Sequence, residues 1–253
     1  MNIHSLKSGS KGNSCLVYTD KTKILVDCGI SGKAVKNAMA EVGVTPEELD
    51  GIVVTHEHSD HIKGIGVMMR RYGIPVYANS ATWAAIHACD LGKLNDEHIK
   101  IFEGTEPFSI GEIGIQPFRI PHDAAYPVGY RFDDGTDSGA VATDMGMLTE
   151  EVMRAIAGCR TVLLESNHDI GMLEVGSYPY QLKQRIRGRL GHLSNDDAGK
   201  GAELLVRMGS ENIILGHLSE ENNYPALAFE TVKSALMSAG ITVGKDLKLS
   251  VAT

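Results

Sequence analysis

Short apolar runs bounded by glycine and polar residues recur along the chain, and longer stretches with a helical spacing of apolar residues lie between them. The short runs predict buried strands at 15–18, 24–26, 51–54, 75–77, 114–118, 140–142, 161–164, 212–215 and 247–251. The longer stretches predict helices at 33–42, 60–72, 80–91, 195–208 and 226–239. Strands mixed with helices along the whole chain predict a layered domain of the α/β or α+β class.

Size and charge narrow the classes of protein to consider. The chain has 253 residues, of which 43% are hydrophobic, so we expect one domain over 1–253 with a single sizeable core. Its 24 lysines and arginines against 32 aspartates and glutamates give a net charge of −8, which argues against a uniformly basic nucleic-acid-binding surface and leaves a local basic patch open. No apolar run reaches the roughly 18 residues of a membrane span, and residues 1–7 do not read as a secretory signal. We therefore expect a cytoplasmic protein without membrane contact.

Potential metal ligands are concentrated in one segment, Thr55-His56-Glu57-His58-Ser59-Asp60-His61, which follows an apolar strand and opens a predicted helix. Residues two apart in an extended chain project to the same side, so His56 and His58 can reach one metal ion. The start of the helix turns Asp60 and His61 toward a second ion. Imidazole and carboxylate donors suit zinc or manganese, with iron as a further alternative. The motif therefore predicts two divalent metal ions.

Further candidate ligands stand directly after other apolar runs. His122, Asp144 and His217 each follow such a run, where loops on a rigid sheet place functional groups. Asp27 ends the strand 24–26, and we expect it to orient a histidine ligand rather than to bind metal itself. The cysteines form no CxxC pair, so we interpret them as free thiols; they are Cys15, Cys28, Cys89 and Cys159.

The segment 8–14, Ser-Gly-Ser-Lys-Gly-Asn-Ser, lacks the GxxxxGK[ST] pattern of a phosphate-binding loop. Its composition predicts a turn between two strands. A second interpretation is that the same turn also lines the rim of the active site.

The order HxHxDH, His122, Asp144, His217 resembles the metallo-β-lactamase superfamily, and the resemblance covers nearly the whole chain. It implies a four-layer αββα sandwich with a dinuclear metal site at one sheet edge. By this resemblance three histidines hold the first metal, a second set holds the other, and Asp144 bridges both. The first set is His56, His58 and His122, and the second set is Asp60, His61 and His217.

Finer features are similar to the bacterial YycJ (WalJ) subgroup of that superfamily. They are the segments 9–14, 26–29, 121–124, 165–169, 191–195 and 216–219. This resemblance implies a DNA exonuclease acting from the 5′ end, with a part in mismatch repair. The chain order also resembles tRNase Z, which implies that Glu165 and His192 form the proton-transfer pair. The segment 164–167 departs from the tRNase Z pattern and its long substrate arm has no obvious equivalent, so we do not expect tRNA end maturation. With Asp60, the pair makes up the predicted catalytic residues.

A basic cluster precedes His192 in this otherwise acidic chain, and we expect it to bind substrate phosphates. Its members are Lys183, Arg185, Arg187 and Arg189. The alternative is a solvated basic helix or loop. His168 is the remaining candidate for the lining of the substrate cleft.

The predicted function is a metal-dependent phosphodiesterase, specifically a 5′-to-3′ exonuclease that attacks DNA with a water activated by two metal ions. Two alternatives stay open. One is a phosphodiesterase acting on a small or cyclic phosphodiester, and the other is a non-hydrolytic metal-binding or redox protein. The sequence leaves the oligomeric state open.

Overall fold

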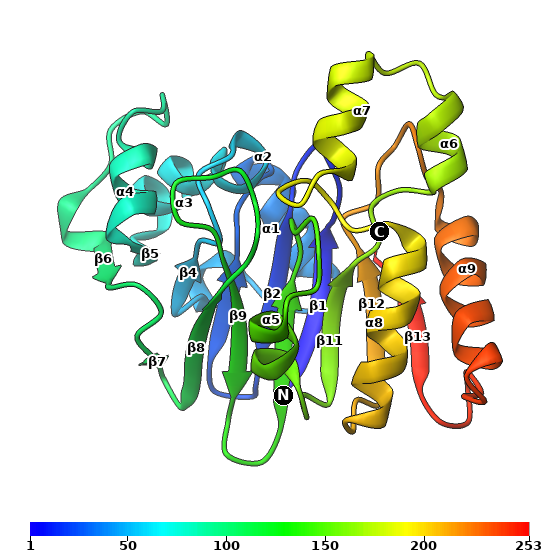
Figure 1. The fold of residues 1–253 in the computed structure, drawn as a ribbon. Helices are drawn as coiled ribbons and strands as arrows, with labels where there is room; N and C mark the ends of the chain where they lie inside the picture. Colours follow the sequence, from blue (N-terminus) through cyan, green and yellow to red (C-terminus); the bar gives the residue numbers. More distant parts are fainter. Residues whose placement is uncertain (253) are drawn as a thin grey trace. The chain divides into compact units, whose positions relative to one another are not determined.

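The computed structural model describes residues 1–252, which form two compact units (Figure 1). Unit 1 contains residues 1–117, 124–128 and 132–135. Unit 2 contains 118–123, 129–131 and, from residue 136 on, the rest of the described chain. Because the chain passes between the units several times, neither unit is one continuous segment. The single domain over 1–253 stays a prediction.

Unit 1 contains a six-stranded sheet with the order β1-β2-β3-β4-β5-β6. Its strands are β1 (Asn2–Lys7), β2 (Ser14–Tyr18), β3 (Lys23–Val26), β4 (Gly51–Val53), β5 (Val76–Asn79) and β6 (Ile99–Phe102). The pairs from β3 to β6 are parallel, and Val26 on β3 lies opposite Val53 on β4. The residues that follow these two strands therefore emerge side by side at one edge of the sheet.

The helices of unit 1 pack a buried core around residues such as Leu25, Ile52 and Trp83. They are α1 (Gly32–Glu41), α2 (Ser59–Ile62), α3 (Ile65–Tyr72) and α4 (Ser80–Ile86), with the 3-10 turns η1 (Pro46–Glu48) and η2 (Asp96–His98). The hairpin of β7 (Phe108–Ile110) and β8 (Ile113–Arg119) follows them.

The single helix predicted at 60–72 is wrong, because the structure divides it into α2 and α3 at Gly64. The amide of Gly64 donates to the carbonyl of Cys28 at 2.7 Å instead of continuing the helix. A Cβ on Gly64 would lie 2.3 Å from the carbonyl oxygen of Ile30, so this close approach of two backbones requires glycine. The helix predicted at 80–91 is also too long; it ends at Ile86 and continues as turns.

Unit 2 is built on parallel strands. The second sheet has the order β13-β12-β11-β10-β9-β8-β7. Its remaining strands are β9 (Val128–Asp133), β10 (Ser138–Ala142), β11 (Thr161–Glu165), β12 (Asn212–Gly216) and β13 (Lys248–Val251). The pairs from β10 to β13 are parallel, with Ala142 opposite Leu164 and Glu165 opposite Gly216. Residues that follow β10, β11 and β12 therefore meet at one edge.

The helices of unit 2 cover a second buried core that includes Val162, Leu164, Leu205 and Val232. They are α5 (Glu150–Ile156), α6 (Ile170–Val175), α7 (Tyr180–Arg187), α8 (Asn195–Arg207) and α9 (Pro225–Ser238). The predicted mixture of strands and helices is confirmed. Several elements were not predicted, and these are β1, β6, β7, β9, α5, α6 and α7. None of the helices formed by residues 1–252 combines the length and the apolar character needed to cross a bilayer.

Candidate metal centre

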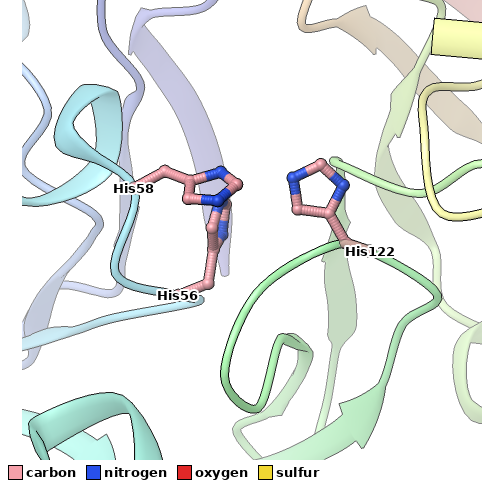
Figure 2. A group of neighbouring side chains, drawn as sticks. All are labelled: His56, His58 and His122. Atoms are coloured by element: carbon pink, nitrogen blue, oxygen red, sulfur yellow. The ribbon is translucent and has the colours of Figure 1, made fainter. Parts of the chain in front are cut away.

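In unit 1, the loop after β4 brings the histidines of the motif together. His56 and His58 lie on the extended part of this loop (Figure 2), and Asp60 and His61 lie in α2. The ring centroids of His56 and His58 are 4.6 Å apart, and those of His56 and His61 are 4.0 Å apart. His56 and His61 are buried, whereas His58 and Asp60 are partly exposed.

Asp27 orients this motif from the end of the neighbouring strand. One carboxylate oxygen accepts from the backbone N–H of Thr55 at 2.8 Å, and the other lies 2.8 Å from both Thr55 Oγ1 and His61 Nδ1. Because Nδ1 of His61 donates to this carboxylate, the lone pair of that imidazole is at Nε2, where a metal would bind. The structure thus places Asp27 in the orienting position expected from the sequence.

Asn13 is a site residue that the sequence analysis missed. Its Nδ2 lies 3.2 Å from Oδ2 of Asp60 and 3.0 Å from Nε2 of His61. Its backbone N–H also donates to the carbonyl of Asp60 at 2.8 Å. The turn at 8–14 therefore contacts the metal motif. The asparagine within a glycine-rich turn was the available signal. Gly29 is needed beside it, because a Cβ there would lie 1.6 Å from the carbonyl oxygen of Asp60.

In unit 2, three histidine side chains approach one carboxylate. Oδ1 of Asp144 lies 3.4 Å from Nε2 of His217, 4.0 Å from Nε2 of His122 and 4.0 Å from Nδ1 of His192. Asp144, His122 and His217 are all buried, with 2%, 5% and 3% of their surface exposed. His122 lies on the loop after β8 (Figure 2). Burial lowers the pKa of His122 and so favours the neutral imidazole that binds metal.

Glu165 holds two of these histidines and is itself fully buried. Its Oε1 lies 2.8 Å from Nδ1 of His192 and 2.9 Å from Nδ1 of His217. Its Oε2 accepts from the backbone N–H groups of Met145 and Leu193 at 2.7 and 3.3 Å. Burial raises the pKa of this carboxyl, but the charge and hydrogen bond of His192 and the hydrogen bond of His217 outweigh it and lower the pKa to about 2. Glu165 is therefore an ionised acceptor, and both imidazoles direct Nε2 away from it.

Three polar residues, one in unit 1 and two in unit 2, have a strained backbone. Among residues 1–252, the non-glycine residues with positive φ are Asp27 (59°), Asp144 (60°) and His217 (55°). Each stands shortly after a strand, and such left-handed backbone costs free energy in non-glycine residues. Conformations of this kind persist where the surrounding structure imposes them, and here they coincide with predicted site residues.

The predicted basic cluster lies on α7 and the loop that follows it. Lys183 donates to the backbone carbonyl of Glu174 at 2.8 Å, and Arg187 pairs with the Glu174 carboxylate at 2.9 Å. Arg185 makes two hydrogen bonds to Asp123, the neighbour of His122, at 2.6 and 3.0 Å. The fourth member, Arg189, is exposed.

His168 differs from the other predicted substrate-binding residues because only 2% of its surface is exposed. Its Nδ1 has no hydrogen-bond partner among the described residues. Burial lowers the pKa of His168 to about 4, against the opposing charge of Glu165.

Histidines and carboxylates that follow sheet strands, with His61 oriented by Asp27 and His217 oriented by Glu165, are the donor set of a metal-dependent hydrolase of the metallo-β-lactamase type. The chain belongs to the β-lactamase superfamily, since residues 22–218 match the model of the beta-lactamase superfamily domain. It is 44% identical over 248 residues to exodeoxyribonuclease WalJ of Streptococcus pneumoniae, covering 96% of this chain and 91% of the relative. It is 38% identical over 244 residues to exodeoxyribonuclease YycJ of Bacillus anthracis, covering 96% and 92%. These likenesses confirm the predicted family and subgroup.

A solved structure confirms the predicted fold class. The metallo-β-lactamase fold protein YhfI from Bacillus subtilis matches with a TM-score of 0.74 and 17% identity, covering 99% of this chain and 96% of that one. Histidine nitrogens and carboxylate oxygens fit a divalent transition metal, and the hydrogen bonds of Asp27 and Glu165 leave Nε2 of His61 and His217 in the form that binds one.

Proposed function

We propose that the protein is an exodeoxyribonuclease that removes nucleotides from the 5′ end of DNA. Two relatives, at 44% and 38% identity, bear the name exodeoxyribonuclease. The structural observation that supports the proposal best is Glu165, which holds a predicted metal ligand, His217, and a predicted proton donor, His192, through one carboxylate oxygen.

We propose that seven side chains hold two divalent metal ions, with zinc or manganese preferred and iron as the alternative. One ion takes His56, His58 and His122, the other takes Asp60, His61 and His217, and Asp144 bridges both, as the family resemblance implies. When bound, such ions lower the pKa of a water molecule and neutralise charge on a phosphodiester.

The hydrogen bonds of the surrounding side chains support the roles proposed for them. Asp60, whose Oδ2 lies 3.2 Å from the Asn13 amide, is the proposed acceptor of the proton of the attacking water. His192 donates a proton from Nε2 to the leaving oxygen, since its Nδ1 is held by Glu165. The ionised Glu165 accepts a hydrogen bond from Nδ1 of this imidazole and so directs Nε2 away from itself. Glu165 is thus a positioning residue that acts through His192 and His217.

The substrate side is proposed to involve the basic cluster and His168. Arg185 presents a fixed guanidinium beside His122 through its two bonds to Asp123. We also propose that the protein acts in the cytoplasm, where the chromosomal DNA of a bacterium lies, and that it serves mismatch repair.

The test uses purified protein with Mn²⁺ or Zn²⁺ and a DNA strand labelled at either its 5′ or its 3′ end. We expect a 5′ label to appear in mononucleotides at once and a 3′ label to stay on progressively shorter strands, with all cleavage abolished by EDTA. A cyclic nucleotide and bis(p-nitrophenyl) phosphate are run in parallel. Hydrolysis of the cyclic nucleotide without hydrolysis of DNA would replace the proposal with the small-phosphodiester alternative.

A further inference from the structure

The helices α6 and α7 form a hairpin in unit 2 that lies beyond the ends of α8 and α9 (Figure 1). We call residues 170–190 the hairpin arm. Glu174 connects α6 to α7, because the backbone carbonyl of Glu174 accepts from Lys183 and its carboxylate pairs with Arg187. The proposed chemistry assigns no role to the tip of this arm.

Large apolar side chains on the hairpin arm face solvent. Val175 is 87% exposed, Tyr180 75% and Leu190 54%. Packing within the fold does not explain them, since side chains exposed to this extent contribute little to the buried core. Tyr180 begins α7, which gives its ring a fixed base on regular structure.

The arm is basic although the chain is acidic. Residues 170–190 contain four lysines and arginines and one glutamate, so the arm carries a formal charge of 4 − 1 = +3 in a chain of −8. Lys183 bonds to a backbone carbonyl, and its ammonium group has no salt bridge among residues 1–252. The ion pair of Arg187 and Glu174 is exposed, and exposed ion pairs contribute little to stability. A phosphate can therefore replace Glu174 as the partner of Arg187 at a small cost in free energy.

The base of the arm is part of the candidate site. The backbone N–H of His192 donates to the carbonyl of Ile186 on α7 at 2.8 Å. The carbonyl of Gly191 lies 3.3 Å from Nδ1 of His122. A Cβ on Gly191 would lie 2.2 Å from the carbonyl oxygen of Arg185, so the turn between α7 and His192 is closely packed. A ligand held on the arm is therefore held at a fixed position relative to His192.

We propose that the hairpin arm binds single-stranded DNA next to the cleavage site, with a base stacked on Tyr180 and phosphates on Lys183 and Arg189. The proposal rests on the proposed exonuclease function and adds the form of the substrate. In a duplex the faces of the bases are covered by their neighbours, whereas an unpaired strand offers both base faces and phosphates. The exposed apolar side chains of the arm can contact the bases of an unpaired strand while its lysine and arginines contact the phosphates. A duplex would contact the cationic side chains alone.

The test measures binding of a fluorescent 16-nucleotide DNA to metal-loaded protein by anisotropy. Phosphorothioate linkages protect the probe from hydrolysis, and a blunt duplex of the same sequence is the second probe. Stacking contributes about 1–3 kcal/mol per base, so Tyr180→Ala should weaken single-strand binding roughly 5- to 150-fold and change duplex binding by less than about 2-fold. Tyr180→Trp should retain single-strand affinity. Tyr224→Ala is the matched control, because Tyr224 is 52% exposed in the same unit outside the arm.

A salt titration tests the phosphate contacts. Arg189→Gln should reduce the slope of log K against log salt by about 0.7 for the single strand. Equal losses on both probes for Tyr180→Ala, or no loss on either, would overturn the proposal. If binding depends on Tyr180 but ordinary DNA is not hydrolysed, the proposed role of the arm in binding would stand and the exonuclease function would be refuted.

Discussion

Nδ1 of His217 lies 2.9 Å from Oε1 of Glu165. The same oxygen accepts from His192 at 2.8 Å, so one buried carboxylate fixes the tautomer of both a predicted ligand and a predicted proton donor. Because the acceptor is shared, substitution of Glu165 should affect metal binding, whereas substitution of His192 should affect proton transfer and leave the metal in place.

Glu165→Gln should weaken metal binding by about 10- to 100-fold, because outer partners of ligating histidines typically contribute that much. The side-chain amide of glutamine would also place an N–H donor against one of the N–H groups that now donate to Glu165. Titration of metal-depleted protein with Zn²⁺ or Mn²⁺ measures the affinity. Glu221→Gln, an exposed change in the same unit, is the control. Unchanged metal affinity in Glu165→Gln would show that His217 needs no such partner.

His192→Ala should retain metal and lose turnover by about 10²- to 10⁴-fold on DNA. Bis(p-nitrophenyl) phosphate should lose much less, since its leaving group departs without a proton. The comparison of kcat on the two substrates checks this, with His87→Ala as an exposed control. Equal losses on both substrates would exclude His192 as the proton donor.

Asp144→Asn should lower the bound metal and abolish cleavage while the fold survives. Asparagine tolerates the left-handed backbone that Asp144 adopts, at φ of 60°, better than alanine does. Elemental analysis and thermal unfolding of the same sample separate metal loss from misfolding. Two equivalents of metal with full activity would refute the bridging assignment.

His168 should make the stability of the metal-free protein depend on pH. Burial lowers its pKa from 6.5 to about 4, so the unfolded chain binds a proton in this window and the folded protein does not. The stabilisation is present above pH 6.5 and should fall by about 1.4 kcal/mol per pH unit toward pH 4. Urea unfolding in EDTA should show this dependence reduced in His168→Gln and retained in His87→Gln. Parallel curves for wild type and His168→Gln would contradict it.

The interleaved chain path of the two units predicts a single cooperative unfolding transition. Trp83, the one tryptophan of the chain, lies in unit 1 and reports on that unit by fluorescence, whereas far-ultraviolet circular dichroism reports on both. The two signals should give the same midpoint in urea. Separate midpoints would divide the chain into two domains.

Local patterns in the sequence were sufficient for the main strands, the longer helices and the metal motif, whereas the pair of Glu165 and His192 was implied by the family resemblance. The spacing of apolar residues that indicates a strand or a helix is a short-range property of the chain. The HxHxDH motif likewise places four potential metal ligands within six residues. The same local reasoning missed the break at Gly64, because that break results from the backbone of Cys28 and Ile30, more than thirty residues earlier in the chain.

Only the tertiary structure decided which distant groups share a hydrogen bond. Parallel pairing sets Val26 beside Val53 and Glu165 beside Gly216, and this register brings Asp27 to His61 and Glu165 to His217. The sequence predicted an orienting role for Asp27 without identifying its partner, and it carries no local mark that ties Glu165 to His217, Asn13 to Asp60 or Arg185 to Asp123. The residue types specified the chemistry that was available, and the order and register of the strands determined which of those residues meet.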